Sequence, residues 1–284
     1  TLVRRAAAPA GSPHVAGVPR VALYRSWNAS MDEGWTRWVF EQLGVSYVTV
    51  TDSTIRQGGL RSRFDVVILP SETDSAIATG RRANTAPAAY TGGLGREGTE
   101  ALRAFLADGG TVIALDEASR FAINRLGAPA RALRTTRGAT EGETVARPNP
   151  DSSSVFRFYA PGSIFEVSVD RSHPIASGMA ASAAVYFISS TILEAGPDAR
   201  VIMSYPTGRN PLLSGYVSGP EVLSGRAALI DAPVGRGHVI LFGFRPQHRG
   251  QTHGTFRVLT NAILYGAAAA PARAEATGRT ATGR

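Results

Sequence analysis

The chain alternates short apolar runs with stretches that carry apolar residues at helical spacing, a pattern typical of a parallel sheet buried between helices. Strands are expected at residues 18–24, 45–51, 64–70, 111–115 and 237–242. Helices are expected at residues 30–44, 97–107, 116–126 and 255–265. This order predicts a three-layer α/β domain of the flavodoxin-like type.

Each predicted helix carries a stripe that should face the sheet. The first helix opens with a capping box of Ser30 and Glu33, which satisfy free backbone donors, and it ends at Gly44. The expected core positions of these helices are Trp35, Trp38, Val39 and Leu43, then Ala101, Leu102, Phe105 and Leu106, and finally Phe256, Leu259, Ile263 and Leu264. Burial at Phe105 would make its truncation to alanine cost about 3–5 kcal/mol.

The pattern changes after residue 126. Residues 127–154 are polar and rich in arginine, which predicts a surface segment, and residues 73–95 predict a long loop rich in Gly, Ala, Thr and Pro. Alternation of apolar and polar residues at 156–158, 164–169, 184–187 and 200–205 predicts antiparallel or edge strands. A hairpin at 233–236 should join residues 227–232 to the last strand. The domain is therefore expected to span 18–266, with a β-rich insertion at about 127–225.

Both ends have a different composition. Residues 1–17 are rich in Ala, Pro and Arg and begin at Thr1, which favours a linker within a longer chain. Residues 267–284 lack an apolar period and are expected to form a disordered tail. The sequence has no apolar run of about 18 residues, so no membrane span is expected.

Charge and cysteine content narrow the chemistry. The net charge is +8, yet all 30 basic residues are arginines scattered along the chain, so we expect no nucleic-acid partner. Cysteine is absent, which excludes disulfides, thiolate zinc sites and cysteine nucleophiles within this sequence.

Polar residues follow several of the predicted strands. Because parallel strands end at one edge of a sheet, these side chains are expected to share a rim. They are Arg25, Trp27, Asn28, Ser71, Glu72, Asp116, Glu117, Arg245, His248 and His253. The rim would suit a binding cleft or an active site. The alternative is that the loops are polar because they are solvated, with Arg245 and Asp116 simply pairing to tie two loops together.

Metal and nucleophile motifs are weak. The histidines are His14, His173, His238, His248 and His253. They form neither a His-x-x-Glu motif nor an i, i+4 pair, so no metal site is expected. The turn at 115–119 has the strand-to-helix form of a nucleophile elbow, but an acid stands at its apex. A Ser119–His248 pair is the alternative catalytic candidate. The glycines at 92–95 could bind an anion, although an ordinary flexible loop fits them better.

Several motifs occur in the order found in a known family. They are VALYRSWNASMDEGWTR at 21–37, YTGGLG at 90–95, FYAPGS at 158–163, NPLLSG at 210–215 and GFRPQHR at 243–249. With them the chain resembles the C-terminal region of large bacterial zinc carboxypeptidases of the carboxypeptidase A-like family. The resemblance implies a class I glutamine amidotransferase-like fold, with zinc bound by a separate upstream peptidase domain. It also implies that the turn of Asp116 to Ser119 occupies the position of the amidotransferase cysteine.

The leading hypothesis is therefore a non-catalytic accessory or ligand-binding domain of an extracytoplasmic zinc carboxypeptidase. Its partners would be the upstream peptidase domain and a peptide or saccharide, with no cofactor in this segment. Its ligand-binding candidates are Arg25, Trp27, Asn28, Glu72, Arg245, His248 and His253. One alternative is an independent hydrolase that uses Asp116 or Ser119 with His248. Another is a polysaccharide- or peptide-binding module.

Overall fold

The computed structural model describes residues 17–28, 30–136 and 155–269. The predicted linker up to residue 16, the segment 137–154 and the predicted tail from residue 270 lie outside the described residues. None of the described helices is both long and apolar enough to cross a membrane.

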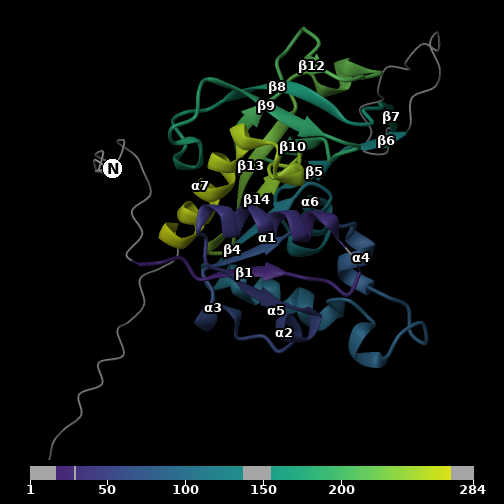
Figure 1. The fold of residues 1–284 in the computed structure, drawn as a ribbon, viewed down its shortest axis with the longest axis vertical. Coiled ribbons are helices and arrows are strands. Elements are labelled where there is room, and N and C mark those ends of the chain that lie inside the picture. Colours follow the sequence, from purple (N-terminus) through teal and green to yellow (C-terminus); the bar gives the residue numbers. More distant parts are fainter. Residues whose placement is uncertain (1–16, 29, 137–154, 270–284) are drawn as a thin grey trace, which may run out of the picture.

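A 12-stranded sheet crosses the domain in the order β12-β8-β11-β13-β14-β4-β3-β1-β2, with β5, β9 and β10 attached beside this path (Figure 1). Its strands are β1 (Val21–Tyr24), β2 (Val48–Val50), β3 (Val66–Leu69), β4 (Thr111–Leu115), β5 (Ala130–Ala132), β8 (Ser163–Val169), β9 (Ser182–Phe187), β10 (Leu193–Ala195), β11 (Arg200–Ser204), β12 (Leu212–Ser214), β13 (Ala227–Val234) and β14 (Gly237–Phe242). A separate parallel pair joins β6 (Arg134–Thr136) to β7 (Val155–Arg157).

The sheet is parallel in one half and antiparallel in the other. Strands β2, β1, β3, β4 and β14 are parallel neighbours, as the apolar runs predict. The β13–β14 hairpin reverses the direction, and β8, β9, β11 and β12 pair antiparallel beyond it. Alternate residues of β8 are buried, which confirms its predicted period of two. The segment predicted as an insertion thus supplies strands that continue the same sheet.

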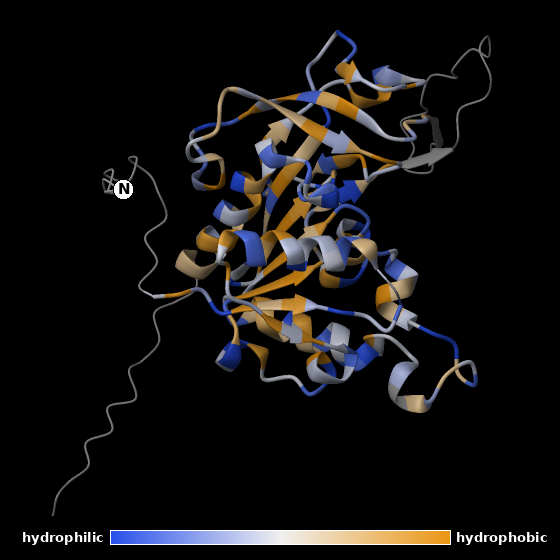
Figure 2. Ribbon diagram, viewed as in Figure 1, coloured by the Kyte–Doolittle hydropathy of each residue, from blue (hydrophilic) through white to orange (hydrophobic). Residues whose placement is uncertain are grey.

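Helices cover both faces of the parallel half. They are α1 (Met31–Leu43), α2 (Asp52–Arg56), α3 (Leu60–Arg63), α4 (Asp74–Thr79), α5 (Gly95–Ala107), α6 (Ala118–Phe121) and α7 (His253–Ala269). Helices α1 and α7 lie on one face, whereas α2, α3 and α5 lie on the other (Figure 1). Successive residues of β1 therefore enter different cores: Val21 and Leu23 face α7, and Ala22 and Tyr24 face α5. Figure 2 shows apolar strands enclosed between helices whose outer sides are polar.

Several local predictions were wrong. The strand at 18–24 begins only at Val21, since Pro19 cannot donate to a ladder, and β2 begins at Val48 because the Val45 amide still donates to Phe40 (2.9 Å). The helix at 116–126 is the short α6 followed by a π-helical turn, Ala122–Leu126. The last helix continues to Ala269, so residues 267–269 do not belong to a disordered tail.

The buried face of α1 also differs from the predicted stripe. Thr36, Val39 and Phe40 are buried, whereas Trp38 and Leu43 are 42% and 48% exposed. Ser30 caps the helix by accepting from the Glu33 amide (3.2 Å), but the Glu33 carboxylate pairs with Arg37 instead of returning to Ser30. On α7, Leu264 is 36% exposed while Leu259 and Ile263 are buried.

The segment 73–95 is not one long loop. It contains α4, whose Thr73 cap accepts from the Ala76 amide (3.2 Å), and a 3₁₀ turn at Ala88–Tyr90. Two of its glycines, Gly80 and Gly93, bring their backbones into close contact, so this part of the segment is packed. A Cβ at Gly93 would lie 2.6 Å from the Gly80 nitrogen, so Gly93 must lack a side chain.

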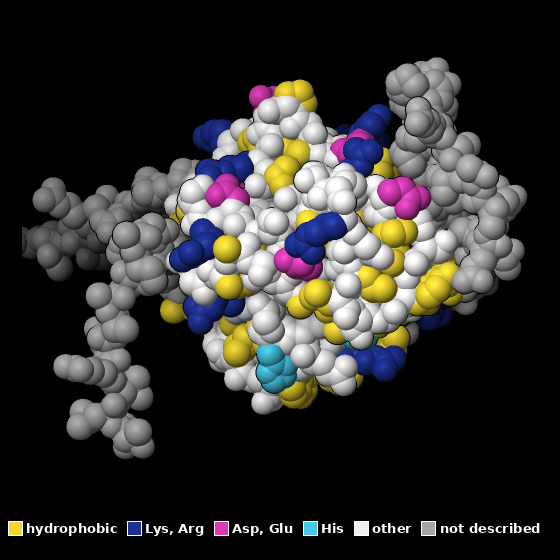
Figure 3. Space-filling model, turned by 90° about the horizontal axis from the view of Figure 1, so that it is seen from above, with side chains coloured by type: hydrophobic (Ala, Val, Ile, Leu, Met, Phe, Trp, Pro, Cys, Tyr) yellow, Lys and Arg dark blue, Asp and Glu magenta, His cyan; other side chains and the backbone are white. Residues whose placement is uncertain are grey.

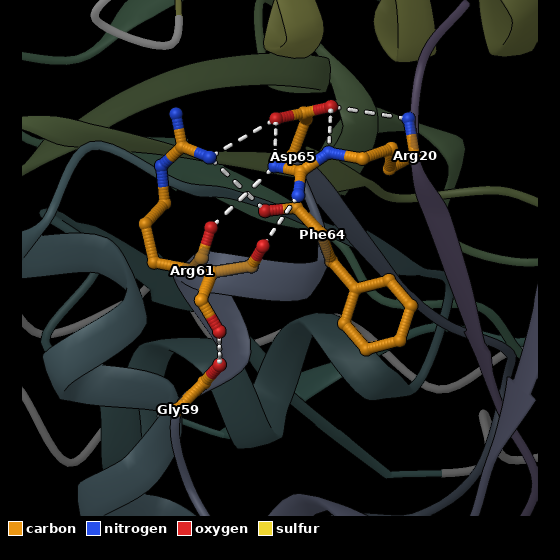
Figure 4. Close-up of polar contacts among 6 residues, drawn as sticks. Arg20, Gly59, Arg61, Phe64 and Asp65 are labelled. Atoms are coloured by element: carbon orange, nitrogen blue, oxygen red, sulfur yellow. Dashed lines mark hydrogen bonds and ion pairs between the residues drawn. The ribbon is translucent and has the colours of Figure 1, made fainter. Parts of the chain in front are cut away.

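An ion-pair cluster fastens the amino-terminal end of β1 to that of β3 (Figure 4). Asp65 accepts from the Arg20 guanidinium (Nε–Oδ2, 3.0 Å) and from Arg61 (Nη1–Oδ1, 3.0 Å). Burial raises the pKa of Asp65, but the hydrogen bonds from Arg20 and the charges of both arginines outweigh it and lower that pKa.

On the face shown in Figure 3, basic, acidic and hydrophobic side chains are interspersed.

Candidate functional site

The turn between β4 and α6 has a strained backbone at Asp116. Asp116 follows the last residue of β4 and has a φ of +53°, in the left-handed region that few residues other than glycine adopt. Asparagine and aspartate tolerate this region better than most residues, because their short polar side chains hydrogen-bond locally. Such a turn presents its apex residue at the carboxyl edge of the sheet.

Asp116 is sealed at this apex. Its side chain is fully buried, and Oδ2 accepts from Arg245 Nε (2.7 Å) and from Ser71 Oγ (3.1 Å). Its Oδ1 accepts from the Thr191 amide (3.3 Å). The pairing of Arg245 with Asp116, one part of the alternative interpretation, is therefore confirmed, but Asp116 is buried and not solvated as that interpretation assumed.

Arg245 bridges to a second acid that the sequence analysis missed. Its Nη1 lies 3.0 Å from Oδ2 of Asp32, in the first turn of α1. Burial raises the pKa of Asp32, and Asp116 raises it further, while Arg245 lowers it. Burial also raises the pKa of the neighbouring Glu117. Asp32 gave no sequence signal beyond the usual acid at the start of a helix.

The alternative catalytic pair of Ser119 and His248 does not form. Ser119 is fully buried, and its hydroxyl donates to the carbonyls of Phe242 (2.9 Å) and Ala114 (3.2 Å). His248 stacks on Tyr186 with a centroid distance of 4.0 Å. Burial, with the nearby charges of Arg245 and Arg249, lowers the pKa of His248 to about 4. The Ser119 hydroxyl is thus bound to two backbone carbonyls and not to the His248 ring.

Arg25, Trp27 and Asn28 share a hollow of about 320 Å³ at the end of β1. Arg81 donates to the Trp27 carbonyl (3.1 Å), and Tyr90 packs edge-on against the indole at 4.4 Å. Behind it, the Ser26 hydroxyl donates to Oε1 of Glu72 (2.6 Å). The buried Trp27 Nε1 and Glu72 Oε2 have no hydrogen-bond partner among the described residues.

His248 and His253 line a different groove, between β9 and the start of α7. The expectation of one cleft shared by all the candidate residues was therefore wrong. The strand order explains the separation, because Arg245 and Asp116 follow β14 and β4, between the ends of β9 and β1. Their paired charges fill the middle of the rim and leave a hollow on one side and a groove on the other.

A second buried polar cluster lies at the opposite edge of the parallel strands. Asp231 contacts His173 (Nε2–Oδ2, 3.2 Å), His238 (Nδ1–Oδ1, 2.8 Å) and the Tyr265 hydroxyl, which donates to Oδ2 (2.7 Å). Burial raises the pKa of Asp231, but these hydrogen bonds outweigh it and lower that pKa. The sequence did contain a signal for this cluster, because Asp231 stands within an apolar strand and a buried acid requires a polar partner.

Replacing Asp231 by asparagine should reduce the free energy of unfolding at pH 7 by about 1–3 kcal/mol, because charged hydrogen bonds become neutral ones. The folded-state pKa of Asp231 is lowered, so its contribution is complete above about pH 4 and is lost as the pH falls through the folded value. Urea denaturation of both proteins from pH 7 to pH 2.5 measures this. A stability gap that stays constant over that range would contradict the assignment.

Among the described residues, no group of three or more His, Asp or Glu side chains is placed to hold a metal ion. The rim instead offers a buried carboxylate–guanidinium cluster, a small polar hollow and a basic groove.

No family model matches the chain, and no curated protein matches its sequence. Solved structures do resemble it. PurLQS from Thermotoga maritima has a TM-score of 0.53 at 11% identity, over 88% of this chain and 99% of that chain. A GMP synthase-type protein from Thermoplasma acidophilum has a TM-score of 0.51 at 11% identity, over 88% and 94%. A cytoplasmic protein of Salmonella typhimurium has a TM-score of 0.50 at 10% identity, over 87% and 98%. These likenesses identify the class I glutamine amidotransferase-like fold.

Proposed function

We propose that this chain is a non-catalytic, ligand-binding domain that has the amidotransferase-like fold without amidotransferase chemistry, and that it serves as an accessory domain of a secreted zinc carboxypeptidase. The observation that carries the first part is Asp116. It has the strained backbone of an elbow, yet its carboxylate is buried and neutralised by Arg245. A nucleophile must reach its substrate, and a carboxylate held by a guanidinium is a poor one.

The accessory role rests on the sequence motifs shared with the zinc carboxypeptidase family. In that arrangement the zinc, the peptidase chemistry and the signal for export belong to the upstream part of the parent protein. The present domain would then bind a peptide or saccharide, or dock against the peptidase domain. The hollow around Trp27 favours a ligand role, because the indole Nε1 of Trp27, which lines it, has no hydrogen-bond partner among the described residues.

An independent hydrolase is the second candidate, and the contacts favour it less. Both Asp116 and Ser119 are fully buried and fully engaged in hydrogen bonds, and His248 faces Tyr186.

The purified chain is expected to hydrolyse neither L-glutamine nor peptides nor p-nitrophenyl esters above the rate of an Asp116→Asn variant. Asparagine tolerates the positive φ at this position, so the variant should keep the fold while removing the carboxylate. Ammonia release and absorbance assays measure the turnover. Hydrolysis that is abolished by Asp116→Asn or His248→Ala would refute the non-catalytic assignment.

The binding role is tested separately by thermal unfolding in the presence of peptides and of soluble saccharides. A ligand that binds the folded state raises the melting temperature, by an amount that grows with its concentration. Trp27→Ala should remove the shift, whereas Trp38→Ala, at an exposed indole on α1, should leave it unchanged. A shift that survives Trp27→Ala would place the ligand outside this hollow.

A further inference from the structure

A second cavity lies beside the sealed elbow. A groove of about 840 Å³ runs between β9 and the segment 248–257, which includes the start of α7. One wall is apolar and is formed by Ile164, Met179, Ala183 and Val185. The other wall carries the His248 ring stacked on Tyr186, together with Arg249, His253 and Arg257. No aspartate or glutamate lines the groove among the described residues.

The two guanidinium groups of this groove are uncompensated. Neither Arg249 nor Arg257 has an ion-pair or hydrogen-bond partner for its guanidinium within the described part of the chain. Elsewhere, Arg20, Arg61 and Arg245 are all paired with carboxylates. Two exposed cations that share a groove without an acid create a local positive potential.

The amino-terminal end of α7 adds to that potential. The helix is 17 residues long, and its first residues, His253 and Gly254, line the groove. Thr252 precedes the helix, but its hydroxyl donates to the Pro246 carbonyl (2.6 Å) instead of capping the first turn. A Cβ built at Gly254 would meet nothing within 4 Å, so the backbone there is open to a small ligand. The His253 and Thr255 amides already donate to the carbonyls of Gln251 and Thr252 (2.9 Å each), whereas the Gly254 amide has no backbone acceptor among the described residues. That amide and the helix dipole both favour an anion at this point.

Arg249 is held in a strained conformation. Its φ of +47° and ψ of 26° are left-handed, where a long side chain is disfavoured and glycine or asparagine is preferred. Such strain persists only where the surrounding structure imposes it, and it is concentrated at ligand-binding positions.

We propose that this groove binds an oxyanion, either a carboxylate or a phosphate, attached to an apolar group. Arg249, Arg257 and the Gly254 amide contact the anion, and the apolar group packs against Met179 and Ile164. The inference is independent of the proposed non-catalytic role. It concerns a different cavity, and the charges of Arg249 and Arg257 are present whether or not the turn at Asp116 is catalytic.

The test uses probes that share an aromatic group and differ in charge. Isothermal titration calorimetry at low salt compares N-acetylphenylalanine with its uncharged amide, phenyl phosphate with phenol, and inorganic phosphate alone. We expect at least one oxyanion probe to bind at least about tenfold more tightly than its neutral counterpart. Whether the acid or the phosphate is preferred identifies the anion, and weak binding of inorganic phosphate would show that the apolar wall contributes.

The variants assign the site. Arg249→Asn removes one guanidinium and suits the left-handed backbone, and Arg257→Gln removes the other from an exposed helix position. The double variant should weaken binding by about tenfold or more. Arg96→Gln, at an exposed arginine of α5, is the matched control and should leave binding unchanged. Equal affinity for charged and neutral probes, no binding of any oxyanion at millimolar concentration, or full binding by the double variant would each overturn the proposal, whatever the hydrolysis assays show.

Discussion

Replacing Arg245 by methionine is expected to lower the free energy of unfolding by about 3–5 kcal/mol. Arg245 pairs with Asp116 at 2.7 Å and with Asp32 at 3.0 Å, and Asp116 is fully buried. Methionine preserves the aliphatic packing of the stem, so the loss reports on two carboxylates left without their cation. Urea denaturation at pH 7, with circular dichroism as the readout, measures the change.

The pH dependence and a second variant separate charge from packing. Burial already raises the pKa of Asp32, and removal of Arg245 withdraws the charge that lowers it. A carboxyl whose folded pKa is raised stabilises the fold at low pH and loses that contribution as the pH rises through the folded value. The deficit of Arg245→Met should therefore be smaller at pH 4 than at pH 7. Adding Asp116→Asn should recover part of it, and a deficit that is unaffected by both changes would mean that the ion pairs contribute nothing.

Truncating Phe105 to alanine should cost a similar amount, about 3–5 kcal/mol, through an entirely apolar mechanism. The ring is 1% exposed and lies over Gly110, where an added Cβ would come within 2.4 Å of Cζ. Because Gly110 contributes no side chain, nothing at that position can refill the space. The loss should be nearly independent of pH between 5 and 8, unlike that of Arg245→Met.

Leu264→Ala is the matched control for Phe105→Ala. Leu264 is 36% exposed on α7, so its truncation should cost less than about 1 kcal/mol. Comparable losses at the two positions would show that burial does not determine stability in these helices.

The rim shows that the strand-to-helix turn at Asp116 can keep its backbone geometry while its apex residue is not available as a nucleophile. The strand-to-helix turn at Asp116 depends on local backbone geometry, which an aspartate tolerates. A carboxylate buried at this apex then requires a cation, and Arg245 supplies it from the loop after β14. The charge that neutralises the elbow also divides the rim, which leaves the Trp27 hollow and the basic groove as the open surfaces.

Most of the parallel sheet was predictable because its strands are buried on both faces. Such strands read as continuous apolar runs, as at β3 and β4, and α5 reads as a helix through its regular stripe. Short elements were missed where polar or small residues dominate, as in α2, α4 and β5, because their stability comes from neighbours distant in the sequence.

The candidate site was predictable as a place but not as a set of contacts. Parallel strands must end at one edge, so the positions of Asp116, Arg25 and Arg245 at the rim follow from the order of strands. Their partners do not follow, because Asp32 lies far from Arg245 along the chain and was expected only to favour the start of a helix.

The amino-acid order alone thus determined the alternation of strands and helices, the absence of cysteine chemistry and the residue at the elbow, since each depends on neighbours along the chain or on composition. Tertiary packing decided which charges meet: Arg245 with Asp32 and Asp116, and Asp231 with His173, His238 and Tyr265. Side chains that are distant in sequence become neighbours only when the sheet is assembled, and burial then selects which of them must pair.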